Sequence, residues 1–197
     1  MPLIRNASDK PSATAAEPQP SPGLASSSAD ARWAASRAAT PNDVPALAQA
    51  LAVEKDDRVR EAIFTALGRI GTADCIVAVL PALRSDDAPR RTGAMDALRL
   101  MPAVEQALPQ LLGDPDSDVR VLACDLARTT GQNGARLLAG LIGVEPQPNV
   151  CAAAVEVLAE IGDAAAIAPL QACAARFPTE PFLGFAIQAA IDRLRPS

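Results

Sequence analysis

The chain has 197 residues, of which 49% are hydrophobic but only 3% aromatic, and a formal net charge of -5. Ala, Leu, Val and Ile supply most of the apolar content, which favours helices packed closely through small side chains. Histidine is absent, so we exclude histidine-dependent hydrolysis and histidine-ligated metal chemistry. The negative charge and the scarcity of aromatic side chains argue against a nucleic acid partner.

Neither a membrane anchor nor a cysteine motif is visible in the sequence. No stretch has the roughly 18 consecutive apolar residues of a membrane-spanning helix, and no apolar segment of signal-peptide length follows the N-terminus. We therefore expect a cytoplasmic protein with no membrane partner. The spacing of the cysteines fits no zinc or redox motif, so we expect small core residues and no metal site. The cysteines are Cys75, Cys124, Cys151 and Cys173.

Two segments differ in character along the chain. Residues 1–28 are rich in Pro, Ala and Ser and show no hydrophobic period, so we predict a flexible, disordered arm that cannot offset its ordering entropy. Residues 29–197 follow a helix–turn–helix pattern with apolar residues three and four apart. Here we predict an all-α solenoid of five helix pairs, preceded by one unpaired helix at 30–38. The predicted pairs are 42–53 with 56–70, 73–84 with 87–100, 103–112 with 116–130, 135–144 with 147–161, and 163–176 with 179–194.

The second helix of each predicted pair repeats a short element, Asp-x-x-x-Arg, near its start. The element is complete in the first three pairs and altered in the last two. Successive copies lie 31, 29, 31 and 32 residues apart, a period typical of stacked supersecondary units. The alignment is anchored on Arg60, Arg91, Arg120, Cys151 and Leu183. Glycines follow three of these helices, where we predict left-handed C-caps: Gly71, Gly131 and Gly162.

These elements resemble the HEAT repeat, and in particular the short bacterial type grouped with the phycobilin lyase HEAT-like repeats. The resemblance is carried by Asp-x-x-Val-Arg at Asp56 and Asp116, Ala-Leu-Gly ending at Gly68, and prolines inside first helices at Pro81 and Pro109. It covers about residues 30–195 and implies a fold more than an activity. It also implies a structural ladder of Asp–Arg contacts from repeat to repeat, formed by Asp56, Arg60, Asp87, Arg91, Asp116 and Arg120.

Enzymes among the HEAT-like proteins leave traces that can be checked in the sequence. Deoxyhypusine hydroxylases hold iron with His–Glu pairs, and this chain has no histidine. HEAT-like DNA glycosylases need a basic, aromatic-lined face, whereas this chain is acidic. Recurring carboxylates at the helix–helix turns, such as Asp56 and Asp57, are better explained as N-caps. We predict no catalytic residue and no cofactor, and a lyase or chaperone for a tetrapyrrole-type prosthetic group stays open as the alternative.

The surface of the second helices is the remaining candidate site. In a solenoid of this type these helices line the concave side, so their outward residues would form a groove with a basic and an acidic row. We predict a non-enzymatic protein-binding module: an adaptor, an assembly factor, or an accessory subunit of a large enzyme or multi-subunit complex. The basic row, Arg69, Arg99 and Arg128, would bind acidic groups of the partner. The predicted groove also contains Thr65, Asp96, Asp125, Glu156 and Glu160.

Overall fold

The computed structural model describes residues 22–195, and every regular element in that range is a helix. Five pairs of α-helices follow one another along the chain. Their first helices are α2 (Val44–Val53), α4 (Ala73–Leu83), α6 (Val104–Leu112), α8 (Gln132–Val144) and α10 (Ile167–Arg176). Their second helices are α3 (Asp57–Ile70), α5 (Ala88–Arg99), α7 (Ser117–Ala127), α9 (Pro148–Ile161) and α11 (Pro181–Leu194).

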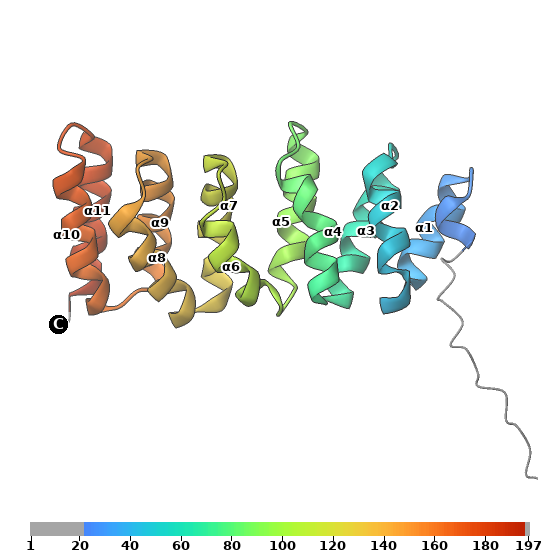
Figure 1. Ribbon diagram of the computed structural model, residues 1–197, viewed down its shortest axis with the longest axis horizontal. Coiled ribbons are helices and arrows are strands. Elements are labelled where there is room, and N and C mark those ends of the chain that lie inside the picture. Colours follow the sequence, from blue (N-terminus) through green and yellow to red (C-terminus); the bar gives the residue numbers. More distant parts are fainter. Residues whose placement is uncertain (1–21, 196–197) are drawn as a thin grey trace, which may run out of the picture.

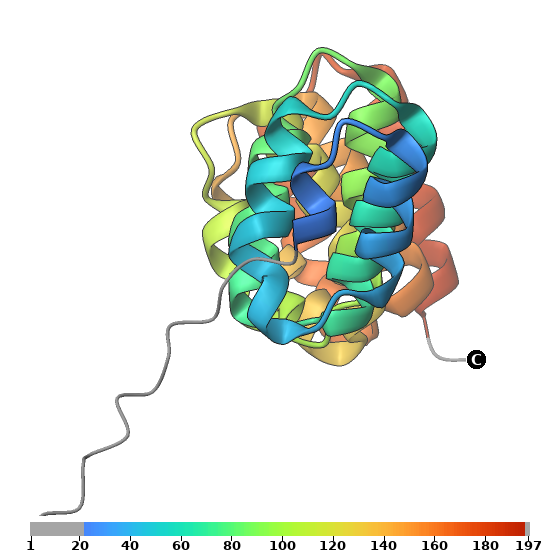
Figure 2. The ribbon, with the colours of Figure 1, turned by 90° about the vertical axis from the view of Figure 1, so that its right-hand side faces the viewer.

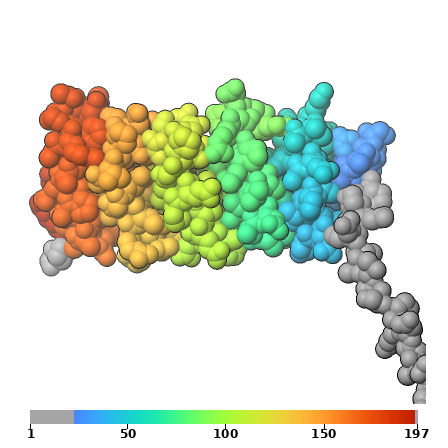
Figure 3. All heavy atoms as spheres, viewed as in Figure 1, coloured from blue at the N-terminus to red at the C-terminus, as the bar shows by residue number. Residues whose placement is uncertain are grey.

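The pairs stack side by side in one row (Figure 1), and the end-on view shows two layers of helices (Figure 2). The second helices form one layer, in which each packs against the next, and the first helices form the other. The space-filling view shows the pairs as consecutive slabs (Figure 3). Each pair therefore covers the apolar side of its neighbour. The predicted all-α solenoid of five helix pairs is confirmed.

The N-terminal end differs from the prediction in one respect. Helix α1 (Ala29–Ala38) stands at the start of the second-helix layer and packs on α3. A short 3₁₀ helix, η1 (Pro22–Ala25), packs against it and buries Leu24. Because η1 packs its apolar Leu24 against the solenoid, the packed structure begins at residue 22, before the predicted boundary at residue 28. The rest of the predicted arm, residues 1–21, lies outside the described residues.

Local sequence sets the ends of the second helices. Asp56 caps α3, because its Oδ1 accepts hydrogen bonds from the amides of the second and third helical residues at 3.0 and 3.1 Å. Gly71 ends α3 with φ 69°, in the left-handed region that glycine adopts at little cost. The prediction of a left-handed cap is wrong for the other two glycines. Gly131 has a positive φ of 56° but a ψ of -129°, outside the left-handed helical region. Gly162 ends α9 in an extended conformation.

The core is one continuous cluster of small and branched apolar side chains along the whole row. All four cysteines are buried and free, as predicted. Burial raises the pKa of Cys124 and of Cys151 to about 12. Both side chains therefore stay protonated thiols and serve as small core residues.

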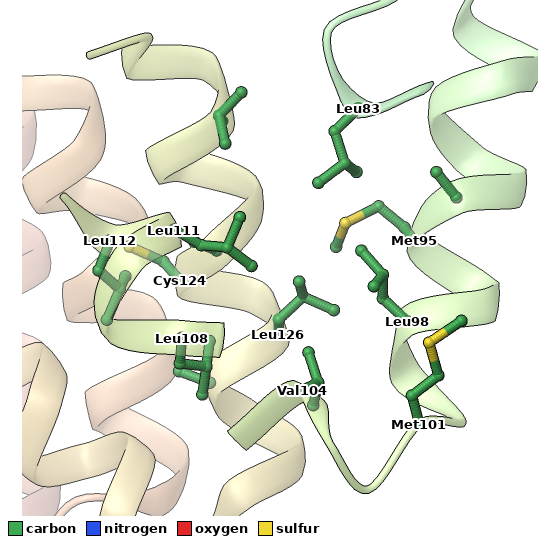
Figure 4. Packing of buried hydrophobic residues seen from close by; sticks show 14 of the residues in the cluster. Leu83, Met95, Leu98, Met101, Val104, Leu108, Leu111, Leu112, Cys124 and Leu126 are labelled. Carbon is green, nitrogen blue, oxygen red and sulfur yellow. The ribbon is translucent and has the colours of Figure 1, made fainter. Parts of the chain in front are cut away.

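The junction between the second and third pairs is less extensive than its neighbours. We call this junction, of α4 and α5 with α6 and α7, the seam; α5 and α7 share fewer close contacts than the other neighbours in their layer. Figure 4 shows Met95 and Leu98 on one wall of the seam and Val104 and Leu126 on the other. All four side chains are buried, so the seam is closed by side chains although its helices approach each other less.

Candidate functional site

The N-caps place the second helices in a common register. They are Asp56, Asp87, Asp116, Gln147 and Glu180. Counted from these caps, Gly184 takes the place of Arg60 in the fifth pair, so the predicted anchor Leu183 is wrong by one residue. Proline is favoured at the first helical position, and α11 therefore begins at Pro181, one residue later than the alignment assumed.

Two rows of side chains recur on the outer side of the second-helix layer, and we call them together the second-helix face. One row is the fifth residue of each helix and the other is the ninth, one turn further on. The fifth residues are Trp33, Glu61, Thr92, Val121, Ala152 and Phe185. The ninth residues are Arg37, Thr65, Asp96, Asp125, Glu156 and Ala189. All of them are at least partly exposed.

Buried arginine–glutamate pairs connect successive repeats beneath this face. Arg120 of α7 binds Glu145 in a bidentate manner, with Nε–Oε2 and Nη2–Oε1 both at 2.8 Å. Arg32 of α1 binds Glu54 in the same way, at 2.7 and 2.9 Å. Each glutamate lies two residues before the N-cap of the next second helix, and its Oε1 also accepts the N-cap amide at 2.9 Å. A single carboxylate therefore fixes both the turn and the neighbouring repeat.

The paired carboxylates stay ionised well below neutral pH. The hydrogen bonds from Arg32 lower the pKa of Glu54 to about 2, although burial opposes this shift. Burial alone would raise the pKa of Glu145, but hydrogen bonds from Arg120 and from the amide of Gln147 hold it below its ordinary value. Protonation of these carboxylates does not loosen the repeats near neutral pH.

The structure differs here from the expected Asp–Arg ladder. Asp56 and Asp116 cap their own helices, because a side chain at the N-cap is close to the free amides of the first turn. One of the expected contacts between repeats is formed: Nη2 of Arg60 lies 3.8 Å from Oδ2 of Asp87, and Arg60 also pairs with Asp57. The buried partners of the ladder are the glutamates before the caps, which the sequence analysis missed.

The ladder is interrupted at the seam. Arg91 occupies the position of Arg32 and Arg120 in its helix. Asp114 occupies the position of Glu54 and Glu145 before the next N-cap. Arg91 and Asp114 nevertheless do not pair. Asp114 is instead bound by Arg84 of the preceding turn. The Nη1 of Arg91 donates to the carbonyl oxygen of Ser85 at 2.5 Å, and Arg91 has no carboxylate partner among residues 22–195. The Arg91 side chain lines a hollow of the second-helix face that lies over α5, α7 and α9.

The predicted basic and acidic rows form one chain of ion pairs from α5 to α9, which we call the charge row. Arg99 contacts Asp96 of its own helix at 2.7 Å and Asp125 of the next helix at 2.6 Å. Arg128 lies 3.5 Å from Asp125, 3.7 Å from Glu156 and also pairs with Glu160. The hydrogen bond to Asp125 raises the pKa of Arg99. The charge row consists of Asp96, Arg99, Asp125, Arg128, Glu156 and Glu160.

The two remaining predicted groove residues lie near the N-terminal end of the same face. The guanidinium of Arg69 donates to the carbonyl oxygen of Ala39 at 2.6 Å and closes the C-terminal end of α1. Thr65 lines a first hollow of about 580 Å³ between α3 and α5, whose floor includes Phe64 and Gly93. Glu61, on its rim, makes no ion pair within the described residues. The hydrogen bond to Ala39 means that the Arg69 guanidinium already has an acceptor within the chain, as do those of Arg99 and Arg128.

The fifth-residue row of the face is apolar in its C-terminal half. A second hollow of about 400 Å³ lies over α5, α7 and α9, and Val121, Leu122 and Val157 line it beside the charge row. The fifth-residue row continues this surface with Val121, Ala152 and Phe185, which we call the apolar stripe. Phe185 is 78% exposed, and Phe182, one turn before it, is 91% exposed. The sequence analysis considered only the ninth-residue row and the row one turn beyond it, so it did not place these phenylalanines on the face.

Neither a metal site nor a membrane span is present in the described range. No group of three or more Cys, Asp or Glu side chains in residues 22–195 could hold a metal ion. No helix within these residues is long and apolar enough to cross a bilayer.

Comparison with known proteins identifies the repeat type over part of the chain. The family model described as HEAT repeats matches residues 104–189, which include α6 to α11 with the exception of the last turn of α11. This match supports HEAT repeats in the third to fifth pairs. A crystal structure of an engineered protein is similar at 18% sequence identity, with a TM-score of 0.43 over 87% of this chain and 93% of that chain. No curated protein matches the sequence.

Proposed function

We propose that this chain is a cytoplasmic, non-enzymatic protein-binding module that serves as an adaptor, assembly factor or accessory subunit of a larger complex. HEAT repeats are generally protein-interaction solenoids, and the match over α6 to α11 supports this assignment. The observation that carries the proposal is the second-helix face. Its two hollows and its apolar stripe are exposed, and the α1–α3 and α7–α9 junctions beneath it are held by Arg–Glu pairs whose carboxylates are buried.

Rigidity of the face favours binding. The Arg32–Glu54 and Arg120–Glu145 pairs hold neighbouring repeats through bidentate contacts, and the charge row joins three second helices on the outside. A surface that is already ordered loses little conformational entropy when a partner binds. The solenoid thus presents a preformed groove.

The role of the arginine row changes in this proposal. Arg69, Arg99 and Arg128 were expected to bind acidic groups of a partner, but each already has an acceptor within the chain. We infer that they hold the groove in shape, whereas the hollows and the apolar stripe contact the partner. The alternative, a lyase or chaperone for a tetrapyrrole, gains little support here: the second hollow has arginines but no aromatic side chain, and the first has one arginine, Arg60, and one aromatic side chain, Phe64.

A photo-crosslinking experiment in the native cell tests the proposal. A photoreactive amino acid would replace Thr92 or Ala152 on the second-helix face, or Val77 of α4, which is 67% exposed in the other layer. We expect one and the same stoichiometric protein to crosslink at both face positions and not at Val77. Equal crosslinking at all three positions, or none at Thr92 and Ala152, would contradict the proposal.

A further inference from the structure

Phe182 and Phe185 are the two most exposed large apolar side chains of the described residues, at 91% and 78%. They lie three positions apart on α11, so they share one side of the helix. Phe185 occupies the fifth position, in line with Val121 and Ala152. Exposed apolar side chains that gather in a row, unlike single scattered ones, mark a binding site.

The two phenylalanines do not form a stacking surface for another repeat. The side that each second helix turns to the next repeat carries its eighth residue, which is buried in α3, α5, α7 and α9 as Phe64, Met95, Cys124 and Val155. In α11 that position is Gln188, whose Nε2 donates to Asp192 at 2.9 Å, and Arg195 donates to the same carboxylate at 3.0 Å. This side of α11 is therefore polar, as in the outer face of a capping repeat. Phe185 is in line with the fifth-residue row instead, and we assign it and Phe182 to the second-helix face.

Acidic groups accompany the apolar stripe on one side. The charge row runs one helical turn from the stripe and contains four carboxylates against two guanidinium groups. Its net charge is therefore negative, and Glu156 is 74% exposed, with only a 3.7 Å contact to Arg128. A partner that covers the stripe would bring its flanking residues next to Glu156, where cationic side chains are favoured, whereas Asp125 is already paired with Arg99 and Arg128.

The repeat spacing selects the conformation of the partner. Neighbouring helices pack about 8–10 Å apart, and an α-helix advances about 10 Å in seven residues while returning to nearly the same face. An extended chain advances about 10 Å in three residues, and because its side chains alternate between two faces, the third residue points away from the surface that the first one contacts. A helix lying across α7, α9 and α11 can therefore place one apolar residue on each, whereas a strand cannot.

Building on the proposed function, we propose that the second-helix face of α7, α9 and α11 binds a basic amphipathic helix of the partner protein. Apolar residues seven apart contact Val121, Ala152 and Phe185, and Phe182 covers the end of the helix. A lysine or arginine one turn away faces the exposed carboxylate of Glu156. The partner is thus basic and helical, in contrast to the acidic segment that the arginine row had suggested.

Synthetic helices test this proposal on the full chain. The probe is a helix-stapled, fluorescein-labelled peptide of about 15 residues with leucine every seven residues and lysine one turn from each leucine. A copy with glutamate in place of lysine tests the charge, and a copy with the leucines five apart tests the register. By fluorescence anisotropy we expect the lysine peptide to bind at least about tenfold more tightly than either copy.

Matched variants locate the contact. The double variant Phe182→Ser, Phe185→Ser should weaken binding of the lysine peptide by at least about tenfold. Glu156→Gln should weaken binding of that peptide less and reduce the salt dependence of its binding. Val144→Ser, at a residue of α8 that is 77% exposed, is the control and should leave binding unchanged. Circular dichroism confirms that each variant is folded.

Several outcomes would overturn the inference. Equal binding of the lysine and glutamate peptides, no binding by either, or binding that ignores the phenylalanine changes would each contradict it. A dimer in light scattering that dissociates on changing Phe182 and Phe185 would assign the patch to a second copy of the chain. If crosslinking at Thr92 and Ala152 succeeds while the peptides fail, the protein-binding function stands and only the basic helix is wrong.

Discussion

Replacing Glu54 with glutamine should make the stability of the protein less dependent on pH. The Glu54 carboxylate is 4% exposed and holds Arg32 through two hydrogen bonds. Its pKa falls from 4.5 to about 2 on folding, and each pKa unit corresponds to about 1.4 kcal/mol. The ionised carboxylate therefore stabilises the fold by up to about 3 kcal/mol above its unfolded pKa.

The sign of the pH effect follows from the direction of this shift. Because the folded pKa is lowered, the stabilisation is complete above about pH 5 and is lost as pH falls from 4.5 towards 2. In urea titrations followed by circular dichroism, Glu54→Gln should be about 2–3 kcal/mol less stable than the parent chain near neutral pH. The difference should shrink by more than about 1 kcal/mol at about pH 3.5.

Glu61→Gln is the matched control for this experiment. Glu61 is exposed and makes no ion pair within residues 22–195, so its change should stay within about 0.5 kcal/mol at every pH. A stability difference for Glu54→Gln that is the same at neutral and acidic pH would refute the electrostatic reasoning. So would a Glu54→Gln protein as stable as Glu61→Gln.

Further predictions concern packing, thiols and local opening. A methyl group on Gly93 would lie 2.5 Å from the Phe64 ring, so Gly93→Ala should cost about 1–3 kcal/mol in thermal unfolding, whereas Gly140→Ala, with no atom within 4 Å, should not destabilise. Cys124 and Cys151 should react with a disulfide reagent only after denaturant is added, since burial raises the pKa of both to about 12; fast reaction of the folded chain would contradict this. Amides of α5 and α6 at the seam should exchange with deuterium before those of α9, and the reverse order would be inconsistent with a weak seam.

Hydrophobic periodicity was sufficient to predict the helices but not their contacts. The apolar residues of α3, Val59, Ile63 and Leu67, recur at helical spacing and are fully buried. The register of α11 was wrong because the alignment used an anchor position where Leu183 replaces arginine. Proline at the first helical position was the available signal for the correct start.

The buried carboxylates of the ladder could have been found from the sequence. Glu54, Asp114 and Glu145 each stand two residues before an N-cap, a recurrence as regular as the Asp-x-x-x-Arg element itself. Which arginine each one binds could not be predicted, because Asp114 pairs with Arg84 rather than with the equivalent Arg91. That choice depends on the spacing of helices at the seam, for which the sequence has no evident signal.

Methyl NMR of the chain, with and without the partner captured by photo-crosslinking, tests the central claim most directly. If the second-helix face is the binding surface, the methyl resonances of Val121 and Val157 should shift or broaden on binding. Those of Val77 and Val144, exposed on first helices, should not. Changes confined to Val77 and Val144 would show that the partner binds the other layer, and the account of the groove would then be wrong.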